Sequence, residues 1–324
     1  MKKNETKGMG YLLTAGMLWG LAGIFVNQLT ALGAGSDFIS FCRVAPAFLI
    51  LLVVASCKYG RKLFQVSART LVFCALTGIF CQAVYNMCYT RAIELVGMST
   101  GAILLYLAPV MTALTSAVIF QEKLTRWKAL ALLINIAGCV LTVTGGGFSG
   151  SGNLPVLGIL FGVGAAAAYS LAPIFGRFAV SDTEPLISTT WTFCFATVFL
   201  MVVTRPVNDV ASVSGIYFLT ILGYAFVPTS LAYLIYYFGL SRITESSRVP
   251  VLTSTEPVVA TLIGVLVYHD SFGVMNLIGM LLVLSSILLM NPEAFSSFLN
   301  RRTAELTEQA KKKAEPVVVR TIRE

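Results

Sequence analysis

The sequence predicts an all-α integral membrane protein with ten transmembrane helices, arranged as two inverted five-helix repeats. Three observations carry this prediction. Of the 324 residues 56% are hydrophobic and 12% charged, with a mean hydropathy of +0.82, which excludes an ordinary soluble protein. The segment from Pro109 to Leu114 (PVMTAL) recurs from Pro257 to Leu262 (PVVATL), an offset of 148 (257 − 109). Basic residues alternate between successive loops.

The ten helices follow from hydropathy, because a bilayer core about 30 Å thick takes roughly 20 apolar residues per helix. We expect them near residues 10–30, 37–57, 70–90, 97–119, 127–145, 156–176, 185–204, 216–238, 246–268 and 273–291.

The repeat fixes the domain organisation. The same offset carries Tyr85 to Tyr233, Tyr89 to Tyr237 and Gly10 to Gly158. We therefore expect a first repeat at 10–145 and a second at 156–291. An odd number of helices per repeat inserts the two copies with opposite orientation, the signature of transporters built around a central site.

The net charge of +8 could indicate a nucleic-acid partner, but its distribution indicates topology instead. Of 23 Lys and Arg residues, Arg91 and Arg205 fall in predicted outer loops and Arg43 inside a helix. The others fall in loops that are inside if the N-terminus is cytoplasmic. This predicts a multi-pass protein of the cytoplasmic membrane with both termini cytoplasmic and no nucleic-acid partner.

Three segments lie outside the repeats. Residues 1–9 form a cytoplasmic N-terminus, and 146–155 form a Gly-rich linker in which no Lys-Ser or Lys-Thr marks a phosphate loop. Residues 292–324 form a basic cytoplasmic tail. Two interpretations of the tail remain open: a solvated segment, or one that adheres to anionic headgroups.

Catalytic and metal chemistry lack candidates. The seven cysteines include no closely spaced pair, and the chain has one histidine, so we expect no metal site, cofactor or disulfide framework. Carboxylates are scattered and the loops are short, which argues against an integral membrane enzyme.

Short motifs resemble one family in order and spacing. They are Leu18-Trp19-Gly20, Phe41-Cys42-Arg43, Tyr89-Thr90-Arg91-Ala92 and Pro109-Val110, followed by Phe120-Gln121-Glu122-Lys123-Leu124-Thr125. From about residue 10 to 291 the chain resembles the drug/metabolite transporter superfamily, specifically its EamA-type permeases. The resemblance implies transport of small metabolites, often amino acids, across the cytoplasmic membrane and frequently outward.

Two departures from the family pattern concern the second repeat. It has His269-Asp270 where the family usually shows Gly-Glu, and Ala167-Ala168 where the first repeat has Trp19-Gly20. The acidic position is kept in kind, so the fold stands, but the substrate of a family member cannot be transferred.

Two charged side chains are predicted at membrane depth, Arg43 in the second helix and Glu256 in the ninth. Such groups cost about 2.5–3.5 kcal/mol on insertion scales unless they face a cavity or a partner. Three alternatives remain open: a permanent salt bridge between them, separate partners among carbonyls and hydroxyls, or a binding role in which Glu256 carries a coupling proton.

Pro109 and Pro257 occupy matching positions in the fourth and ninth helices. Each releases carbonyl groups from helical hydrogen bonding, which is tolerated at depth inside protein or beside a water-lined cavity. We expect both helices to border the central cavity; a packing kink without a ligand is the alternative.

Aromatic side chains form the predicted binding surface. Tyr85 and Tyr89 lie one turn apart, as do Tyr233 and Tyr237, and symmetry places the pairs across the repeat interface. Phenol faces hold apolar or cationic groups; interfacial anchoring is the alternative. The remaining candidate wall residues are Trp19, Asn86, Tyr106 and Tyr169.

Glu122 and Asp270 each end a helix shortly before the next, so we expect each to cap the following helix N-terminus. His269 is expected at the outer edge as a surface residue, with pH sensing as the alternative. The motifs Gly16-xxx-Gly20 and Gly158-xxx-Gly162 indicate close helix packing within the monomer, and the oligomeric state stays open.

The function predicted from these features is a secondary transporter that moves a small metabolite, an amino acid or related amine, by alternating access, as an exporter. The partners expected are that substrate and the lipid bilayer, with proton coupling through Glu256 open against facilitated transport. A channel-like or non-transporting membrane protein is the alternative, which leaves the paired prolines and tyrosines unexplained.

Overall fold

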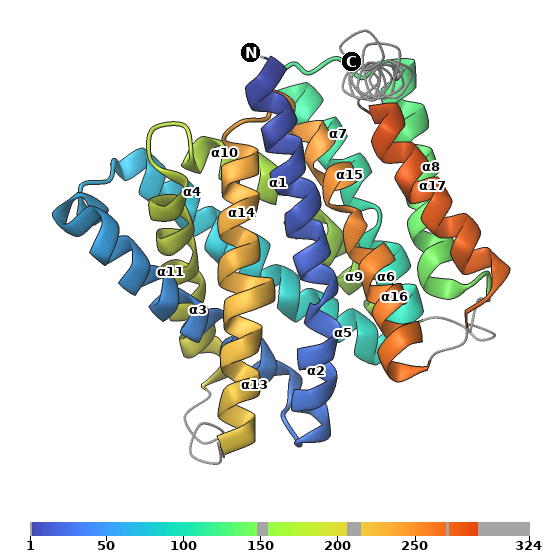
Figure 1. Cartoon of the computed structure of the whole chain (residues 1–324), viewed down its shortest axis with the longest axis horizontal. Coiled ribbons are helices and arrows are strands. Elements are labelled where there is room, and N and C mark those ends of the chain that lie inside the picture. The colour runs from blue at the N-terminus through green and yellow to red at the C-terminus, as the bar shows by residue number, and fades with distance from the viewer. Residues whose placement is uncertain (1, 148–154, 206–214, 270–271, 291–324) are drawn as a thin grey trace, which may run out of the picture.

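The structure is a computed structural model that describes residues 2–147, 155–205, 215–269 and 272–290. Those residues form helices and no strand, in ten spans that we number in chain order (Figure 1). Span 1 is α1 (Lys2–Gly20) with α2 (Ala22–Ala31); span 2 is α3 (Ser36–Tyr59) with η1 (Gly60–Phe64); span 3 is α4 (Ala68–Gly78), η2 (Ile79–Val84) and α5 (Tyr85–Val96); span 4 is α6 (Met98–Leu105) with α7 (Ala108–Ile119); span 5 is α8 (Arg126–Thr144).

The second repeat has the same five spans. Span 6 is α9 (Val156–Ser170) with α10 (Ala172–Ala179); span 7 is α11 (Pro185–Thr204); span 8 is α13 (Gly215–Ala225), η3 (Phe226–Leu231) and α14 (Ala232–Leu240); span 9 is η4 (Ser246–Arg248), α15 (Val249–Thr253) and α16 (Thr255–Tyr268); span 10 is α17 (Val274–Met290).

The predicted ten helices are confirmed. Among the described residues nine segments are long and apolar enough to cross a bilayer, and Val274–Met290 is a shorter apolar helix. The largest boundary differences are at span 1, which begins at Lys2 instead of near residue 10, at span 2, which continues through η1 to Phe64, and at span 3, which continues to Val96. Span 3 ends where Gly97 adopts a φ of +82°, a conformation that favours glycine.

The odd-numbered spans begin at the end of the bundle that holds Lys2, uppermost in Figure 1, and the even-numbered spans end there. We call this the N-terminal end and the other the opposite end. Residues 148–154 of the expected linker and the whole expected tail lie outside the described residues.

Helix interruptions recur in both repeats at nearly the offset seen in the sequence. Span 1 breaks at Leu21 and span 6 at Leu171. Span 4 breaks at Tyr106–Leu107 and span 9 at Ser254. Spans 3 and 8 each contain a π-helical segment, Ile79–Val84 and Phe226–Leu231. Such irregular backbone in a membrane helix must be enclosed by protein or line a cavity, so these positions indicate where a site lies.

Glycines let the spans approach closely at three interfaces. Any side chain at Gly138 or Gly279 would collide with backbone of the partner helix where spans 5 and 10 cross. Gly16 and Gly20 pack in the same way against Thr255 and Val259 of span 9, and the glycines at 158 and 162 against spans 3 and 4. Both glycine motifs therefore serve contacts inside the chain, as small residues do in lipid.

Asn135 of span 5 links span 10 to the break in span 9. Its side chain is fully buried, donates to Ser286 Oγ at 3.0 Å and accepts from Ser254 Oγ at 3.1 Å. Because both amide atoms are used, this buried polar group is satisfied, and it holds Ser254, the residue at the break, against the packed pair of helices.

Candidate functional site

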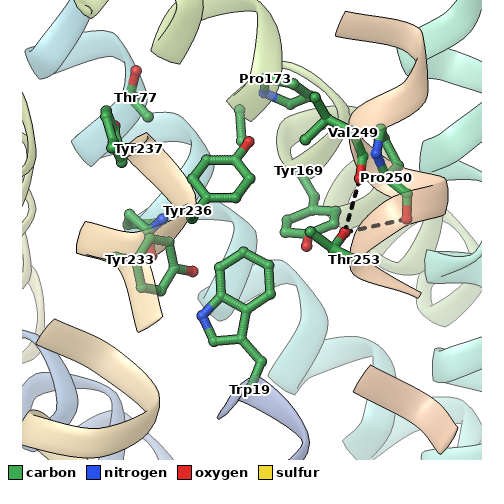
Figure 2. Close-up of a pocket in the computed structure, with 12 residues that line it drawn as sticks. Trp19, Thr77, Tyr169, Pro173, Tyr233, Tyr236, Tyr237, Val249, Pro250 and Thr253 are labelled. Atoms are coloured by element: carbon green, nitrogen blue, oxygen red, sulfur yellow. Dashed lines mark hydrogen bonds between the residues drawn. The ribbon is translucent and has the colours of Figure 1, made fainter. Parts of the chain in front are cut away.

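A narrow cavity lies where the interrupted spans meet, and Figure 2 shows the side chains around it. Its volume is about 10 Å³, close to what one water molecule needs. The lining residues come from five spans: Trp19; Thr77 and Gln82; Tyr169, Ala172 and Pro173; Tyr233, Tyr236 and Tyr237; Val249, Pro250 and Thr253. Trp19, Gln82, Tyr169, Tyr233 and Thr253 each lie within or next to one of the helix interruptions.

Five of the twelve lining residues are aromatic. The ring of Trp19 lies 4.9 Å from that of Tyr233 and 5.3 Å from that of Tyr236, centre to centre. The hydroxyl of Tyr237 lies 3.0 Å from Thr192 Oγ1, so its ring is fixed by a buried hydrogen bond. Figure 2 shows Trp19, Tyr169 and Tyr236 facing the same space from different helices.

The two repeats contribute equivalent ring pairs. Trp19 of span 1 packs against Tyr233 of span 8 at 4.9 Å, and Tyr169 of span 6 packs against Tyr85 of span 3 at 5.0 Å, both with the rings tilted. Each pair joins a residue just before a break to one just after a π-helical segment. Tyr169 is therefore the structural equivalent of Trp19 in the second repeat. The 148-residue offset had paired Trp19 with Ala167, two residues earlier in the chain.

Arg43 sits behind the wall rather than in it. One Nη donates to the Tyr233 hydroxyl at 3.2 Å, and the guanidinium lies 5.7 Å from the ring centre of Tyr233 and 6.0 Å from that of Tyr224. Its Nε has no hydrogen-bond partner among the described residues. The cation is therefore held mainly by phenols, by a hydrogen bond and by cation–π attraction.

Glu256 lies in the first turn of α16, directly after the break at Ser254. No ion pair within 4.0 Å joins it to Arg43, and no described residue hydrogen-bonds its carboxylate. It is within electrostatic range of Arg43 and of Tyr85, Tyr89, Tyr106 and Tyr169. The helix N-terminus favours a negative charge at this position, so the carboxylate remains available to another partner.

The other predicted site residues have different positions. Tyr85 stacks with Tyr89 at 5.9 Å and reaches the cavity through its contact with Tyr169. Tyr106 caps the end of α6 at the break in span 4. The amide of Asn86 donates to the carbonyl of Gln82 one turn earlier, so it faces its own helix.

Pro109 and Pro257 follow the breaks instead of lying at them. Pro109 is the second residue of α7 and Pro257 the third of α16, where a missing N–H costs no hydrogen bond. Span 9 borders the cavity through Val249, Pro250 and Thr253, and neither predicted proline is among the lining residues.

Sequence reasoning missed several lining residues. Tyr236 had a signal, because it lies beside Tyr237 in span 8. Pro173 and Pro250 also had one, as prolines near helix breaks. Gln82 is an amide within an apolar span, which the same argument that selected Arg43 and Glu256 could have found.

Comparison with known proteins decides the family. The model of the EamA-like transporter family matches residues 6–144 and 156–291, one match for each repeat. The chain belongs to the EamA-like transporter family. It is accordingly a multi-pass membrane transporter by family, which agrees with its ten apolar spans.

Relatives in the EamA-like transporter family support this membership at low identity. The chain is 24% identical over 291 residues to YicL of Salmonella typhimurium, described as an uncharacterized inner membrane transporter, covering 88% of this chain and 95% of the relative. It is 25% identical over 288 residues to the transporter YyaM of Bacillus subtilis, covering 86% and 90%. A crystal structure with 19% identity has the same fold, with a TM-score of 0.72 over 89% of this chain and 97% of that one.

In this EamA-family chain the prediction for Glu122 is wrong about which helix the side chain caps. We expected Glu122 to cap the following helix, but Thr125 Oγ1 caps α8 by accepting from Lys128 N at 3.3 Å. Glu122 instead caps span 9: its oxygens accept from Ser246 N at 2.6 Å and from Ser247 N and Oγ at 3.1 and 2.6 Å. A carboxylate at a helix N-terminus is stabilised there, and this one joins the two repeats.

Further ion pairs surround Glu122 at the N-terminal end. Arg177 Nη1 lies 3.2 Å from Glu122 Oε1, and Lys128 Nζ lies 2.6 Å from Glu245 Oε1. Arg248 pairs with Glu245 and reaches Glu5 at 3.5 Å. We call this set the latch: Glu5, Glu122, Lys128, Arg177, Glu245 and Arg248.

An aromatic layer accompanies the latch. Phe178 of span 6 stacks on Phe73 at 4.6 Å and packs against Phe120 at 5.2 Å, and the Arg177 guanidinium lies 4.3 Å from the Phe120 ring centre. Spans 3 and 4 of the first repeat thereby contact span 6 of the second, so the N-terminal end is closed by apolar and charged contacts together.

At the opposite end His269 ends α16 in a left-handed conformation with a φ of +56° and is exposed. Gln121, the residue 148 positions earlier, has a φ of +53°, so the turn after span 9 repeats the turn after span 4. Asp270, expected to cap a helix there, lies outside the described residues.

Proposed function

We propose that this EamA-family protein is a secondary transporter that moves a small metabolite across the cytoplasmic membrane by alternating access. The carrying observation is the cavity at the junction of interrupted helices from both repeats, closed at the N-terminal end by the latch and the aromatic layer. Rocking of the repeats about such a site exposes it to each side in turn.

The substrate class we propose is an amino acid or related amine. Rings of Trp19, Tyr169 and Tyr236 offer faces for a cation or an aromatic group, and Glu256 is a carboxylate that no described residue pairs with within 4.0 Å. An amine could approach both. Arg43, engaged by Tyr233 and Tyr224, supplies a positive field on the other side of the wall.

The orientation we propose sets the N-terminal end in the cytoplasm. Basic residues are concentrated at that end, with Lys58, Lys62, Arg69 and Arg126 beside those of the latch, whereas the opposite end has Arg91 and Arg205. This asymmetry follows the positive-inside rule. Export, the direction implied by the family resemblance, would begin with opening of the latch.

Solute counterflow tests the transport claim. Purified protein in liposomes loaded with an unlabelled amine or amino acid should accumulate the labelled compound transiently, and liposomes without protein should not. Ion currents in place of exchange would support a channel, and the absence of exchange across a panel of amines and amino acids would contradict the transporter of this class.

Proton coupling is proposed to run through Glu256, because this carboxylate lies at membrane depth, beside a helix break, and forms no ion pair with any residue that the structure describes. Glu256→Gln should retain exchange but lose its response to an imposed pH gradient. The matched control is Glu94→Gln, which removes an exposed carboxylate paired with Arg91 at the opposite end. If wild-type exchange does not respond to the pH gradient, proton coupling is contradicted and the protein is a facilitator.

A further inference from the structure

Two buried polar atoms of the cavity wall have no protein partner. Trp19 is 6% exposed and its Nε1 donates to nothing, and Gln82 is 2% exposed and its Oε1 accepts from nothing among the described residues. Both side chains line the cavity. Because an unsatisfied buried donor or acceptor costs free energy, a group bound in this cavity that pairs with both atoms would remove that cost.

Tyr233 holds the two side chains together. Its ring packs against that of Trp19 at 4.9 Å in a tilted arrangement, and its hydroxyl takes a hydrogen bond from Arg43 and interacts with the side chain of Gln82. The indole and the amide therefore both contact one phenol, which Arg43 holds in place. Figure 2 shows the indole of Trp19 directed into the ring of tyrosines.

The chemistry of the cavity wall limits which chemical group can bind between these side chains. The residues that line the cavity include no charged side chain, only aromatic, hydroxyl, amide and apolar groups. A hydroxyl group can accept from an indole N–H and donate to an amide oxygen without carrying charge, so it satisfies both atoms. The cavity volume of about 10 Å³ accommodates a single such oxygen.

We propose that Trp19 Nε1 and Gln82 Oε1 form a subsite that binds a hydroxyl group of the transported compound. This rests on the proposed function, since it names the substrate as a hydroxylated member of the amine or amino-acid class. The subsite determines specificity: a compound without the hydroxyl leaves both buried atoms unpaired, which is the situation in which a site discriminates strongly.

The wild-type test is binding by matched probes. Thermal shifts of the detergent-purified protein are measured with tyramine against phenethylamine and with serine against alanine. We expect the hydroxylated member of at least one pair to bind at least about tenfold more tightly than its partner. Equal shifts in both pairs, or no shift with either hydroxylated compound, would overturn the proposal.

Variants separate a ligand subsite from a structural role. Trp19→Phe and Gln82→Met remove the unpaired atoms and should leave the melting temperature of the empty protein unchanged or higher, while abolishing the preference for the hydroxylated probe. A drop of several degrees in the empty protein would show that these atoms serve packing and would contradict the subsite.

The chain supplies matched controls in which the same atoms are paired. Trp191 Nε1 donates to the Leu63 carbonyl at 3.0 Å, and Asn135 uses both amide atoms. Trp191→Phe and Asn135→Leu should lower the melting temperature and keep the probe preference. Counterflow with the same compounds distinguishes the subsite from the proposed transport. Exchange that is equal with and without the hydroxyl would contradict the subsite and leave the transport claim standing. Hydroxyl-dependent binding without any exchange would contradict the transport claim and leave the subsite standing.

Discussion

The two ends of the bundle are built from equivalent segments, yet their charged contacts differ. At the N-terminal end the latch joins the repeats through Glu122, Lys128, Arg177, Glu245 and Arg248. At the positions related by the 148-residue offset, four of these charges are replaced at the opposite end by uncharged residues: Leu29, Gly97, Thr100 and Asn276. Glu122 alone has an acidic counterpart there, Asp270, which lies outside the described residues. The described ion pair there, Arg91 with Glu94, lies within span 3.

This difference teaches how an inverted repeat can favour one state. Duplication alone would produce two ends that open with equal ease, because each is the image of the other. Partly buried ion pairs and capped helix ends on one side lower the energy of the state closed there. The charged end should therefore resist opening, and the predictions below weaken it in graded steps.

The largest effect is expected from Glu122→Gln. The amide cannot pair with Arg177 and caps the backbone of Ser246 and Ser247 less well, so the closed N-terminal end should lose about 3 kcal/mol. With a single reactive cysteine at Thr77 in a background without the native cysteines, labelling by an impermeant thiol reagent from the N-terminal side should rise at least about tenfold. Unchanged labelling would mean that Glu122 does not hold this end closed.

A smaller effect is expected at Lys128 and Glu245. Lys128→Met and Glu245→Gln each break the 2.6 Å pair, so the double variant should be less impaired than the summed single effects, with a coupling of about 1 kcal/mol. The measurement is the same labelling rate in a double-mutant cycle. Asn276→Leu, at the counterpart of Lys128, serves as the control and should leave that rate unchanged. If the two single effects add without coupling, the pair of Lys128 and Glu245 does not help to hold the N-terminal end closed.

The smallest effect is expected from salt. Raising ionic strength from 0.1 to 1 M shortens the Debye length from about 10 to 3 Å, which weakens the partly exposed pair of Arg248 and Glu5. Labelling from the N-terminal side should increase about twofold, and labelling from the opposite side should not increase. An equal response at both ends would contradict the asymmetry.

Much of the fold could be predicted from the sequence, because hydropathy over about 20 residues and a recurring motif report helix length and duplication directly. The breaks within the spans were harder to predict. No proline accompanies the break at Leu21, whereas Pro173 follows the break at Leu171. The prolines at 109 and 257 follow breaks in spans 4 and 9 whose exact positions depend on tertiary contacts such as that of Asn135 with Ser254.

The candidate site was predicted in part. Trp19, Tyr169, Tyr233 and Tyr237 line the cavity, because large aromatics repeated at one offset mark the repeat interface. Their partners depend on a two-residue shift between spans 1 and 6 that no alignment at fixed offset contains. The target of Glu122 could not be predicted either, since Ser246 and Ser247 are distant in sequence and meet it through the crossing of the repeats.

The most direct test of the central claim is a pair of distances measured in one protein. Spin labels at Leu124 and Ser241 report on the N-terminal end, and labels at Gln28 and His269 report on the opposite end; all four residues are exposed. Alternating access with a latched N-terminal end predicts a short, narrow distance for the first pair in the wild type. In Glu122→Gln a longer distance should appear there while the second pair shortens. Distances that do not change, or that lengthen at both ends together, would contradict the account.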